Sequence, residues 1–191
     1  MDAPELHRKR CKRINRRGDF RYLTFSCFKR QPFLMRDRAR QWLVESIIEA
    51  RRRHGFHLLA WVFMPEHAHI LILPQKPPFS TSPILSSIKL PVAIHVRNFL
   101  VKNAPWFLAQ MLDEQPNGKR AFRFWQRGGG YDRNIFSAKE LYEKIRYIHR
   151  NPVRRKLVTR TTDWEWSSAR DYAGMAPGKI PLDLDALTWM W

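Results

Sequence analysis

Two histidines separated by one residue, His67 and His69, stand in the apolar stretch AWVFMPEHAHILILP (Ala60–Pro74). If this stretch forms strands, alternate side chains share a face, so both imidazoles lie on one face and the apolar residues around them lie on the other. Two imidazoles on an apolar strand are costly to bury without partners. A divalent metal ion is one partner that would hold both, and a satisfied core or surface pair is the alternative that the residues alone leave open.

A metal site built from this pair needs a further ligand. Imidazole favours zinc, copper, nickel or manganese over magnesium, which prefers oxygen ligands, so an oxygen-bearing side chain is expected nearby. Glu66 is adjacent in the sequence, but the side chain of a neighbouring residue in a strand or turn is expected to point elsewhere. The third ligand is therefore sought outside this stretch.

The second group that could do chemistry is Tyr147, in a segment with helical spacing. On a helix it shares a face with residues three and four positions away, namely Lys144, Arg150 and Asn151. A phenol flanked by cations near a metal-bound phosphate is a competent nucleophile, and Asn151 could offer its side-chain oxygen to the same metal. The alternative is a tyrosine that only packs at the edge of the core, with its hydroxyl in water. His149 falls outside this face and is expected to be structural or DNA-facing.

Hydrophobic periodicity predicts the elements that position these groups. Ser137 and Glu140 form a capping box at the start of the last helix. Pro152 is expected to end that helix near Asn151, and Pro91 is expected to kink or shorten an earlier helix. The predicted strands are Arg21–Phe28, Leu58–Met64, His67–Leu73 and one or two edge strands within Arg120–Phe136; the predicted helices are Arg36–Arg53, Ile84–Lys102 and Ser137–Asn151.

The order of these elements is strand, helix, strand, strand, helix, strand, helix, which predicts an α+β fold. The first six match the βαββαβ order of a ferredoxin-like unit, with one sheet and helices on one face, and the seventh is a C-terminal helix that carries the tyrosine. A chain of 191 residues that is 44% hydrophobic is expected to form one domain. Its expected parts are a basic N-terminal arm (1–19), the main domain (20–158) and a tail (159–191) that packs on or extends from it. The tail is expected to hold a short helix packed by tryptophans, followed by a loosely attached end.

The charge balance points to a polyanionic partner. The chain has 35 Lys and Arg against 17 Asp and Glu, a net charge of +18, and such an excess favours nucleic acid. An anionic membrane surface is the other class of partner, but no Lys- and Arg-rich amphipathic helix, signal peptide or apolar run of about 18 residues stands out. Cys11 and Cys27 form neither a disulfide framework nor a zinc spacing, so a reducing cytoplasm is expected.

Four segments of the chain resemble one known family. MPEHAHILI resembles the metal-binding motif of HUH transposases, in which two histidines flank an apolar residue, and RYIHRNPVRRKLV is similar to their tyrosine helix. FWQRGGGYDRNIF and DWEWSSARDY also resemble segments of this group. The motifs fall in the family's order over about Phe20–Tyr172. Together they resemble the REP-associated tyrosine transposases, a branch of the single-tyrosine HUH transposases and endonucleases.

This resemblance implies a metal-dependent single-stranded DNA endonuclease and strand transferase. His67 and His69 would hold Mg²⁺ or Mn²⁺ with Asn151 as the third ligand, and Tyr147 would attack the scissile phosphate. The implied products are a 5′-phosphotyrosine and a free 3′-OH, and attack by a 3′-OH rejoins the strand. The implied partner is a single-stranded DNA hairpin, either REP-like or from a transposon end. The same branch implies a monomer in preference to a dimer, in the bacterial cytoplasm and on the nucleoid when bound.

DNA binding is then expected to combine phosphate contacts by Lys and Arg with stacking of bases on aromatic rings. The candidates for stacking are Phe124, Trp125 and Tyr131. Two of the candidates for phosphate contact, Arg154 and Arg155, directly follow the tyrosine helix and are preferred. The full set of candidates for phosphate contact is Lys89, Arg97, Arg123, Arg127, Arg133, Arg150, Arg154 and Arg155.

The chain departs from the family pattern at four positions. Glu66 stands where Asn is usual, and Ala68 stands where a bulkier apolar residue is usual. Gly129 and Gly130 replace bulkier residues, so they are expected to loosen an edge near the DNA face. None of these departures removes a proposed ligand or the nucleophile.

Two other functions stay open. The first is a ferredoxin-like binding protein for single-stranded DNA or RNA, without catalysis, in which the two histidines and Tyr147 only pack. Aromatic rings exposed across the sheet would indicate such a binder, whereas convergence of both imidazoles and the phenol on one point would indicate the enzyme. The second is a zinc hydrolase, which needs another firm ligand that the sequence does not convincingly offer.

Overall fold

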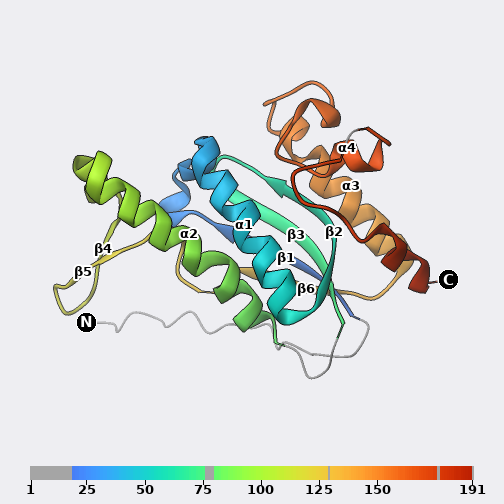
Figure 1. Ribbon diagram of the computed structural model, residues 1–191, viewed down its shortest axis with the longest axis horizontal. Coiled ribbons are helices and arrows are strands. Elements are labelled where there is room, and N and C mark those ends of the chain that lie inside the picture. The colour runs from blue at the N-terminus through green and yellow to red at the C-terminus, as the bar shows by residue number, and fades with distance from the viewer. Residues whose placement is uncertain (1–18, 76–79, 129, 176, 191) are drawn as a thin grey trace, which may run out of the picture.

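Figure 1 shows the computed structural model of the chain, which describes residues 19–75, 80–128, 130–175 and 177–190. Its centre is a four-stranded antiparallel sheet with the strand order β2-β3-β1-β6. The basic arm expected at residues 1–19 lies outside the described residues except for its last position. The sheet strands are β1 (Phe20–Ser26), β2 (Phe56–Phe63), β3 (His67–Pro74) and β6 (Tyr131–Ile135), and the main helices are α1 (Asp37–His54), α2 (Thr81–Asn103) and α3 (Ala138–Arg154).

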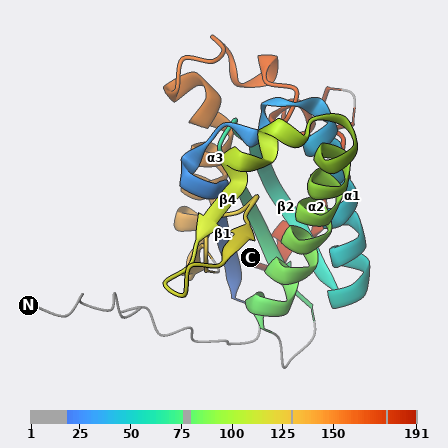
Figure 2. The same cartoon turned by 90° about the vertical axis from the view of Figure 1, so that its left-hand side faces the viewer.

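Alternation along the strands gives the sheet two buried faces. On one face, Leu23 of β1 and Ile70 of β3 belong to a core that α1 and α2 cover. On the other face, Tyr22 of β1 and Leu71 of β3 belong to a second core, to which α3 contributes Ile148. Figure 2 shows α1 and α2 on one side of the strands and α3 on the other. The helix that carries the tyrosine therefore has one face of the sheet largely to itself.

The predicted α+β class, an antiparallel sheet with helices, is confirmed. The placement of helices on one face holds for α1 and α2, while the helix of Tyr147 covers the opposite face because its apolar stripe needs apolar surface to pack on. The prediction that the neighbours of His67 and His69 face away from them is also confirmed, since Ala68 and Ile70 lie in the α1 and α2 core. The ferredoxin-like assignment is compatible with the strand order and stays a prediction.

Of the predictions on where the helices begin, end or bend, the cap at Ser137 agrees with the structure and the effects expected of two prolines do not. The hydroxyl of Ser137 accepts the backbone N–H of Glu140 at 3.2 Å, as expected of a capping residue. The prediction that Pro152 ends the helix at Asn151 is wrong, because α3 continues past both residues. Both are buried, so tertiary packing holds this turn although proline removes one backbone donor. In the same way, α2 runs without interruption through Pro91.

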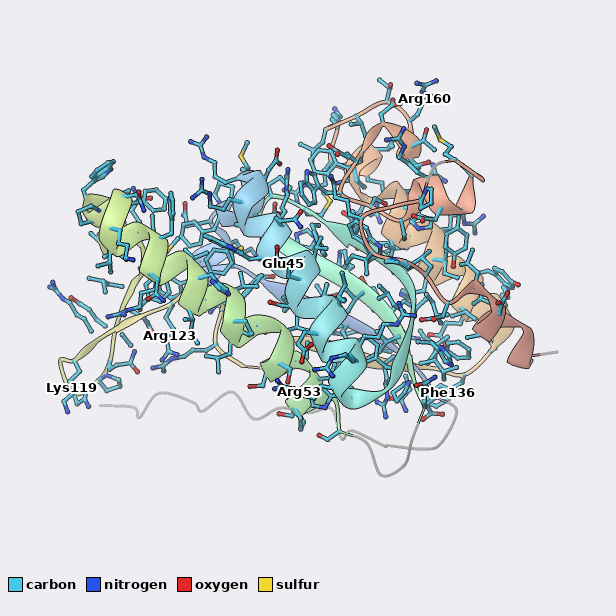
Figure 3. All side chains as sticks on the ribbon, viewed as in Figure 1. Glu45, Arg53, Lys119, Arg123, Phe136 and Arg160 are labelled. Atoms are coloured by element: carbon cyan, nitrogen blue, oxygen red, sulfur yellow. The ribbon has the colours of Figure 1, made fainter. Side chains whose placement is uncertain are left out.

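A small hairpin follows α2 and stands apart from the main sheet. It consists of β4 (Leu112–Glu114) and β5 (Arg120–Phe122), and the N–H of Gly118 donates to the carbonyl of Gln115 in the turn that joins them. Of the edge strands expected after residue 120, β5 thus belongs to this hairpin and β6 forms the edge of the main sheet. Figure 3 shows Lys119, in the turn, at one end of the long axis of the molecule.

Short helices complete the described chain. One turn of α-helix, α4 (Ala169–Tyr172), matches the short helix expected in the tail, and Trp166 just before it is buried. The 3-10 helices span Phe28–Arg30, Phe33–Met35, Pro105–Met111, Thr161–Asp163 and Leu184–Met190.

The tail is attached more firmly than expected. The carbonyl of Trp166 accepts the N–H of Phe63 at 2.8 Å, and Asp183 exchanges two hydrogen bonds with the backbone of Leu58 at 2.8 and 2.9 Å. Both contacts satisfy the outer edge of β2, whose backbone groups would otherwise lack a strand partner. The prediction of a loosely attached end is therefore wrong at least as far as Ala186, which is buried in the α3 core.

Gly130 makes a close backbone contact rather than loosening an edge. Its φ is +75°, and a Cβ built on it would lie 2.0 Å from the carbonyl oxygen of Thr24 in β1. Glycine is therefore required here both for its backbone conformation and for the approach of the loop to β1. Its neighbour Gly129 lies outside the described residues.

We predict that Gly130→Ala lowers the free energy of unfolding by more than the roughly 1–3 kcal/mol that a left-handed backbone conformation costs. Urea denaturation measures this loss. Gly118→Ala is the matched control, because Gly118 has a φ of +74° but a Cβ there would meet nothing within 4 Å. The control should lose only the cost of the left-handed conformation. Equal losses in the two variants would contradict the steric explanation for Gly130.

By length and composition alone, α2 could cross a membrane, since its most apolar window has a mean hydropathy of 1.3. This apolar character has an explanation within the fold, because residues such as Ile88 and Val92 pack into the core that α1 shares. Among the described residues, α2 is the one helix of this kind.

Candidate metal and phosphate site

A pocket of about 340 Å³ opens where β1, β3 and the last turns of α3 meet. Antiparallel pairing sets Thr24 opposite His69 and Ser26 opposite His67, so the two strands contribute side chains to the same place. The pocket is lined by Thr24, Ser26, Arg30, His67, His69, Tyr147, Asn151, Arg154 and Arg155.

The two imidazoles point at each other across this pocket. The distance between His67 Nε2 and His69 Nε2 is 2.9 Å, and both side chains are buried. The Asn151 side-chain amide reaches the same point, with its Nδ2 at 2.9 Å from His69 Nε2. The structure thus brings together the three residues that the sequence proposes as metal ligands.

The opposite nitrogens of both rings have hydrogen-bond partners that orient them. His67 Nδ1 donates to Glu66 Oε1 at 3.0 Å. His69 Nδ1 lies 2.7 Å from the hydroxyl of Tyr22 and 2.7 Å from that of Thr24. With a proton on each Nδ1, both Nε2 atoms present lone pairs to the pocket, and two facing lone pairs need a cation or a donor between them.

This donor set fits a divalent ion. Adjacent ligands of an octahedral ion with bonds of about 2.1 Å lie about 3 Å apart, which matches the separation of the two Nε2 atoms. Rotation of the Asn151 amide would present Oδ1 in place of Nδ2 and supply the oxygen ligand. Within the described ranges, no group of three His, Cys, Asp or Glu side chains converges on one point, so this oxygen comes from an amide rather than a carboxylate.

Burial keeps both rings neutral. Desolvation lowers the pKa of His69 to about 3, and it also lowers the pKa of His67. For His69, the proximity of His67 and of the Lys144 ammonium acts in the same direction. Neutral imidazoles at pH 7 have the free lone pairs that a metal requires.

Glu66 does not line the pocket, as expected for a neighbour of His67 in a turn, but it contacts His67 from behind. Its carboxylate is buried and contacts both His67 Nδ1 and the Arg155 guanidinium, with Nη1 of Arg155 at 3.0 Å from Oε1. The carboxylate therefore lies behind the His67 ring, on the side opposite to the pocket. The tight turn after β2 places it there, since the Glu66 carbonyl also accepts the N–H of Cys27 at 2.8 Å.

Tyr147 lines the pocket from α3 and is 37% exposed. Its ring stands edge to face against His69, with 5.8 Å between the ring centroids. Two cations lie beside the ring, with Lys144 Nζ at 5.4 Å and the Arg154 guanidinium carbon at 5.1 Å from its centroid. The Tyr147 phenol therefore lies next to the imidazole pair and to two positively charged side chains.

The candidates for phosphate contact are dispersed over the surface. Arg154 and Arg155 line the pocket, and Arg150 is exposed on the same helix. Lys89 and Arg97 belong to α2, which covers the opposite face of the sheet. The remaining three are paired with carboxylates: Arg123 and Arg127 with Asp113, and Arg133 with Glu140.

The prediction that Phe124 and Trp125 stack on bases is wrong, because both rings are buried in the core under α1 and α2. Trp125 also uses its indole N–H, which donates to the Lys89 carbonyl at 2.8 Å. Tyr131 is 51% exposed and packs edge to face against Tyr22, at 6.0 Å between centroids. Of the three predicted stacking residues, Tyr131 alone has an accessible ring.

Several residues that line the pocket or contact its histidines were not predicted from the sequence. Thr24 and Tyr22 lie on the strand face that also carries the histidines, and the alternation of β1 could have indicated this if the strand pairing had been known. Arg30 has no sequence signal. It reaches the pocket because Lys29 and Arg30 both adopt left-handed backbone conformations, with φ of 51° and 54°. Strained backbone of this kind is concentrated at functional sites.

His149 has a structural role. It is buried on α3, its Nε2 lies 2.9 Å from the Ser168 hydroxyl, and its ring packs against Tyr172. The alternative of a DNA-facing position is therefore wrong, because no part of DNA could reach this ring without opening the packing of the tail on α3.

We predict that the protein loses stability as the pH falls from about 6.5 to 4. Desolvation lowers the pKa of His149 from 6.5 to about 4, so in this range the unfolded chain binds a proton that the folded chain does not. The loss attributable to this residue approaches about 3 kcal/mol at the acid end. Urea denaturation in the presence of a chelator, between pH 7.5 and 4, measures it. The slope should be reduced in His149→Gln, which stays neutral, and an unchanged slope would contradict the assignment.

An antiparallel sheet that presents two imidazoles to a tyrosine-bearing helix is the arrangement that the resemblance to single-tyrosine transposases implies. No family model matches the chain. Among curated proteins, it is 28% identical over 145 residues to the REP-associated tyrosine transposase of Escherichia coli K12, and the match covers 75% of this chain and 71% of that protein.

Comparison with solved structures finds a similar fold. The chain is similar to a REP-associated tyrosine transposase bound to a REP hairpin, with a TM-score of 0.65, 24% identity and coverage of 93% of both chains. A putative transposase from Deinococcus radiodurans R1 is 16% identical at a TM-score of 0.43, over 71% of this chain and 92% of that one. The similarity to REP-associated tyrosine transposases that the motifs indicate is thus confirmed for most of the chain, and the curated relative supports a transposase or DNA endonuclease function. The solved structure shows that the fold is shared.

Proposed function

We propose that this protein is a metal-dependent single-stranded DNA endonuclease and strand transferase that cleaves DNA near hairpins through a 5′-phosphotyrosine intermediate. One observation carries the proposal: His69 Nε2 lies 2.9 Å from His67 Nε2 and 2.9 Å from the Asn151 amide, in a pocket that Tyr147 also lines. The similarity to a curated transposase adds to it.

The nucleophile in this proposal is the Tyr147 oxygen. It attacks the scissile phosphorus, a bond forms between the phenol oxygen and phosphorus, and the bond from phosphorus to the 3′ oxygen breaks. The departing oxygen takes up a proton in place of the one that the phenol loses and becomes a free 3′-OH, while the fragment downstream of the cut stays attached to the protein through its 5′ phosphate. Attack of a 3′-OH on this phosphotyrosine rejoins a strand and releases the phenol.

The ligands for a metal ion are His67, His69 and Asn151. Bound Mg²⁺ or Mn²⁺ would polarise the scissile phosphate and neutralise the charge that develops on it. The protein supplies the rest of the positive charge from Arg30, Arg154 and Arg155, which line the pocket, and from Lys144 beside the phenol. These cations hold the phosphate against the nucleophile and stabilise the transition state.

The proposed substrate is a single-stranded DNA hairpin, because the relative with a solved structure is bound to a REP hairpin. Tyr131, which is exposed beside Tyr22, is placed to stack on a base next to the pocket. Of the other predicted phosphate contacts, Arg150 remains part of this proposal because it lies exposed on α3. A cytoplasmic location with nucleoid association, a monomeric state, and the division into an arm (1–19), a domain (20–158) and a tail (159–191) also belong to the proposal.

The alternative of a non-catalytic binding protein has less support. Such a protein would present aromatic rings across an open sheet face, whereas here helices cover both faces and Phe124 and Trp125 are buried. The two alternatives are separated by incubating the protein with labelled hairpin DNA and Mn²⁺ or Mg²⁺, followed by denaturing electrophoresis. A DNA-linked protein band is expected for the transposase. Tight, salt-sensitive binding without such a band, across hairpins from the native genome, would favour the binder.

A further inference from the structure

Glu66 is a buried carboxylate that the proposed chemistry does not use directly. It is 7% exposed and lies next in sequence to a proposed ligand. Its Oε1 accepts a hydrogen bond from His67 Nδ1 at 3.0 Å and lies 3.0 Å from Nη1 of Arg155. Three residues thus form a chain that runs from the C-terminal end of α3, through the turn after β2, to the first imidazole of the pair.

A buried carboxylate needs partners, and those found here are specific. The Arg155 guanidinium compensates its charge, and the Arg155 backbone N–H is itself fixed by donating to the Asn151 carbonyl at 3.0 Å. The Glu66 backbone is fixed as well, since its carbonyl accepts the Cys27 N–H at 2.8 Å. The carboxylate is therefore held behind the imidazole from both sides.

The consequence for His67 is a single tautomer and a single ring orientation. With its Nδ1 proton donated to Glu66, the ring can present only the Nε2 lone pair to the pocket. The other imidazole is oriented differently, since His69 Nδ1 contacts the hydroxyls of Tyr22 and Thr24. Among the described residues, Glu66 is the one acidic side chain that contacts either ring.

We propose that Glu66, held in place by Arg155, is a positioning residue that fixes the tautomer and orientation of His67 for metal binding. The inference rests on the proposed function, because it presumes an ion at the paired imidazoles. It also gives Arg155 a second role besides phosphate contact, linking the tyrosine helix to the histidine strand. Carboxylates that hold a ligating imidazole in this way typically change metal affinity about 10–100-fold when they are removed.

The test measures Mn²⁺ binding to the DNA-free protein by titration calorimetry, so that it does not depend on catalysis. Glu66→Ala is expected to weaken Mn²⁺ binding about 10–100-fold. Glu66→Gln is expected to recover most of this loss, because an amide oxygen still accepts the Nδ1 proton although the charge is gone. Equal losses in the two variants would overturn the inference, since they would show that the charge matters and the orientation does not.

A matched control is available in Glu114, whose carboxylate pairs with Arg120 at 3.2 Å on the exposed β4-β5 hairpin. Glu114→Ala should bind Mn²⁺ as the unaltered protein does, and thermal melts show that each variant is folded. The ¹⁵N shifts of the His67 ring add a direct readout: a protonated Nδ1 in the unaltered protein and in Glu66→Gln, and a mixture of tautomers in Glu66→Ala. Tautomers that do not respond to Glu66→Ala would overturn the inference.

His67→Ala separates this inference from the proposed function. If His67→Ala loses Mn²⁺ binding while Glu66→Ala retains it in full, the positioning role is wrong and the metal site stands. If His67→Ala binds Mn²⁺ as tightly as the unaltered protein, the metal site itself is wrong and the positioning role fails with it. Support requires loss of binding in His67→Ala together with the graded order of the two Glu66 variants.

Discussion

Tyr147→Phe should abolish both the covalent protein–DNA complex and the cleavage of single-stranded hairpin DNA, with a loss of rate on the order of 10⁴-fold or more. The physical reason is that phenylalanine keeps the ring and its contacts with His69 but removes the oxygen that attacks phosphorus. Binding of the hairpin should be nearly unchanged, because the ring and the arginines that line the pocket remain. Denaturing gels and a binding titration on the same preparation measure the two effects.

Tyr142 provides the matched control for this substitution. It lies on the same helix and is 46% exposed, but it does not line the pocket. Tyr142→Phe should form the covalent complex at the normal rate. Tyr131→Phe tests an alternative nucleophile, since Tyr131 is exposed and its ring packs against that of Tyr22. Cleavage by Tyr147→Phe at a normal rate would exclude the nucleophile that we propose.

His69→Ala should remove metal-dependent cleavage to a similar extent. Of the three proposed ligands, His69 contacts both others: its Nε2 lies 2.9 Å from His67 Nε2 and 2.9 Å from the Asn151 amide. Its removal leaves one imidazole and one amide, so the ion would lose one of its three proposed protein ligands. We expect the metal concentration needed for half-maximal cleavage to rise at least about 100-fold, or activity to vanish.

The measurement is a titration of cleavage against Mn²⁺ and against Mg²⁺. His95→Ala is a suitable control, because His95 lies on α2, on the other side of the sheet, where its ring stacks on Trp42. Its metal dependence should match that of the unaltered protein. If His69→Ala cleaves with the same metal dependence as the unaltered protein, the ion binds elsewhere and the ligand assignment is wrong.

Tyr147→Phe and His69→Ala are expected to differ in their effect on stability, so folding is measured for both variants. Tyr147 is partly exposed, so its change to phenylalanine should alter stability little. His69 is buried and bonded to Tyr22 and Thr24, so its removal leaves two hydroxyls with one partner fewer. His69→Asn and His69→Gln keep a polar group at this position and guard against a loss of activity that only reflects unfolding.

Local sequence patterns predict the candidate ligands and nucleophile and the strand and helix that carry them. The period-two pattern around His67 and His69 predicts that both imidazoles share a face, because side chains of a strand alternate regardless of the rest of the fold. The helical period after Ser137 similarly predicts that Tyr147 and Asn151 share a face, one turn apart. Local geometry decides both relations, and the structure agrees with them.

The surroundings of these groups depend on contacts between distant segments of the chain. Glu66 faces His67 because the turn after β2 is anchored to Cys27, and α3 continues past Pro152 because that turn is buried. Likewise, Phe124 and Trp125 are core residues rather than stacking platforms, since an alternating aromatic and basic pattern does not reveal which face of a short segment is covered. Such contacts join residues that are far apart in the sequence, and local propensity carries no information about them until the sheet order and the packing of its faces are known.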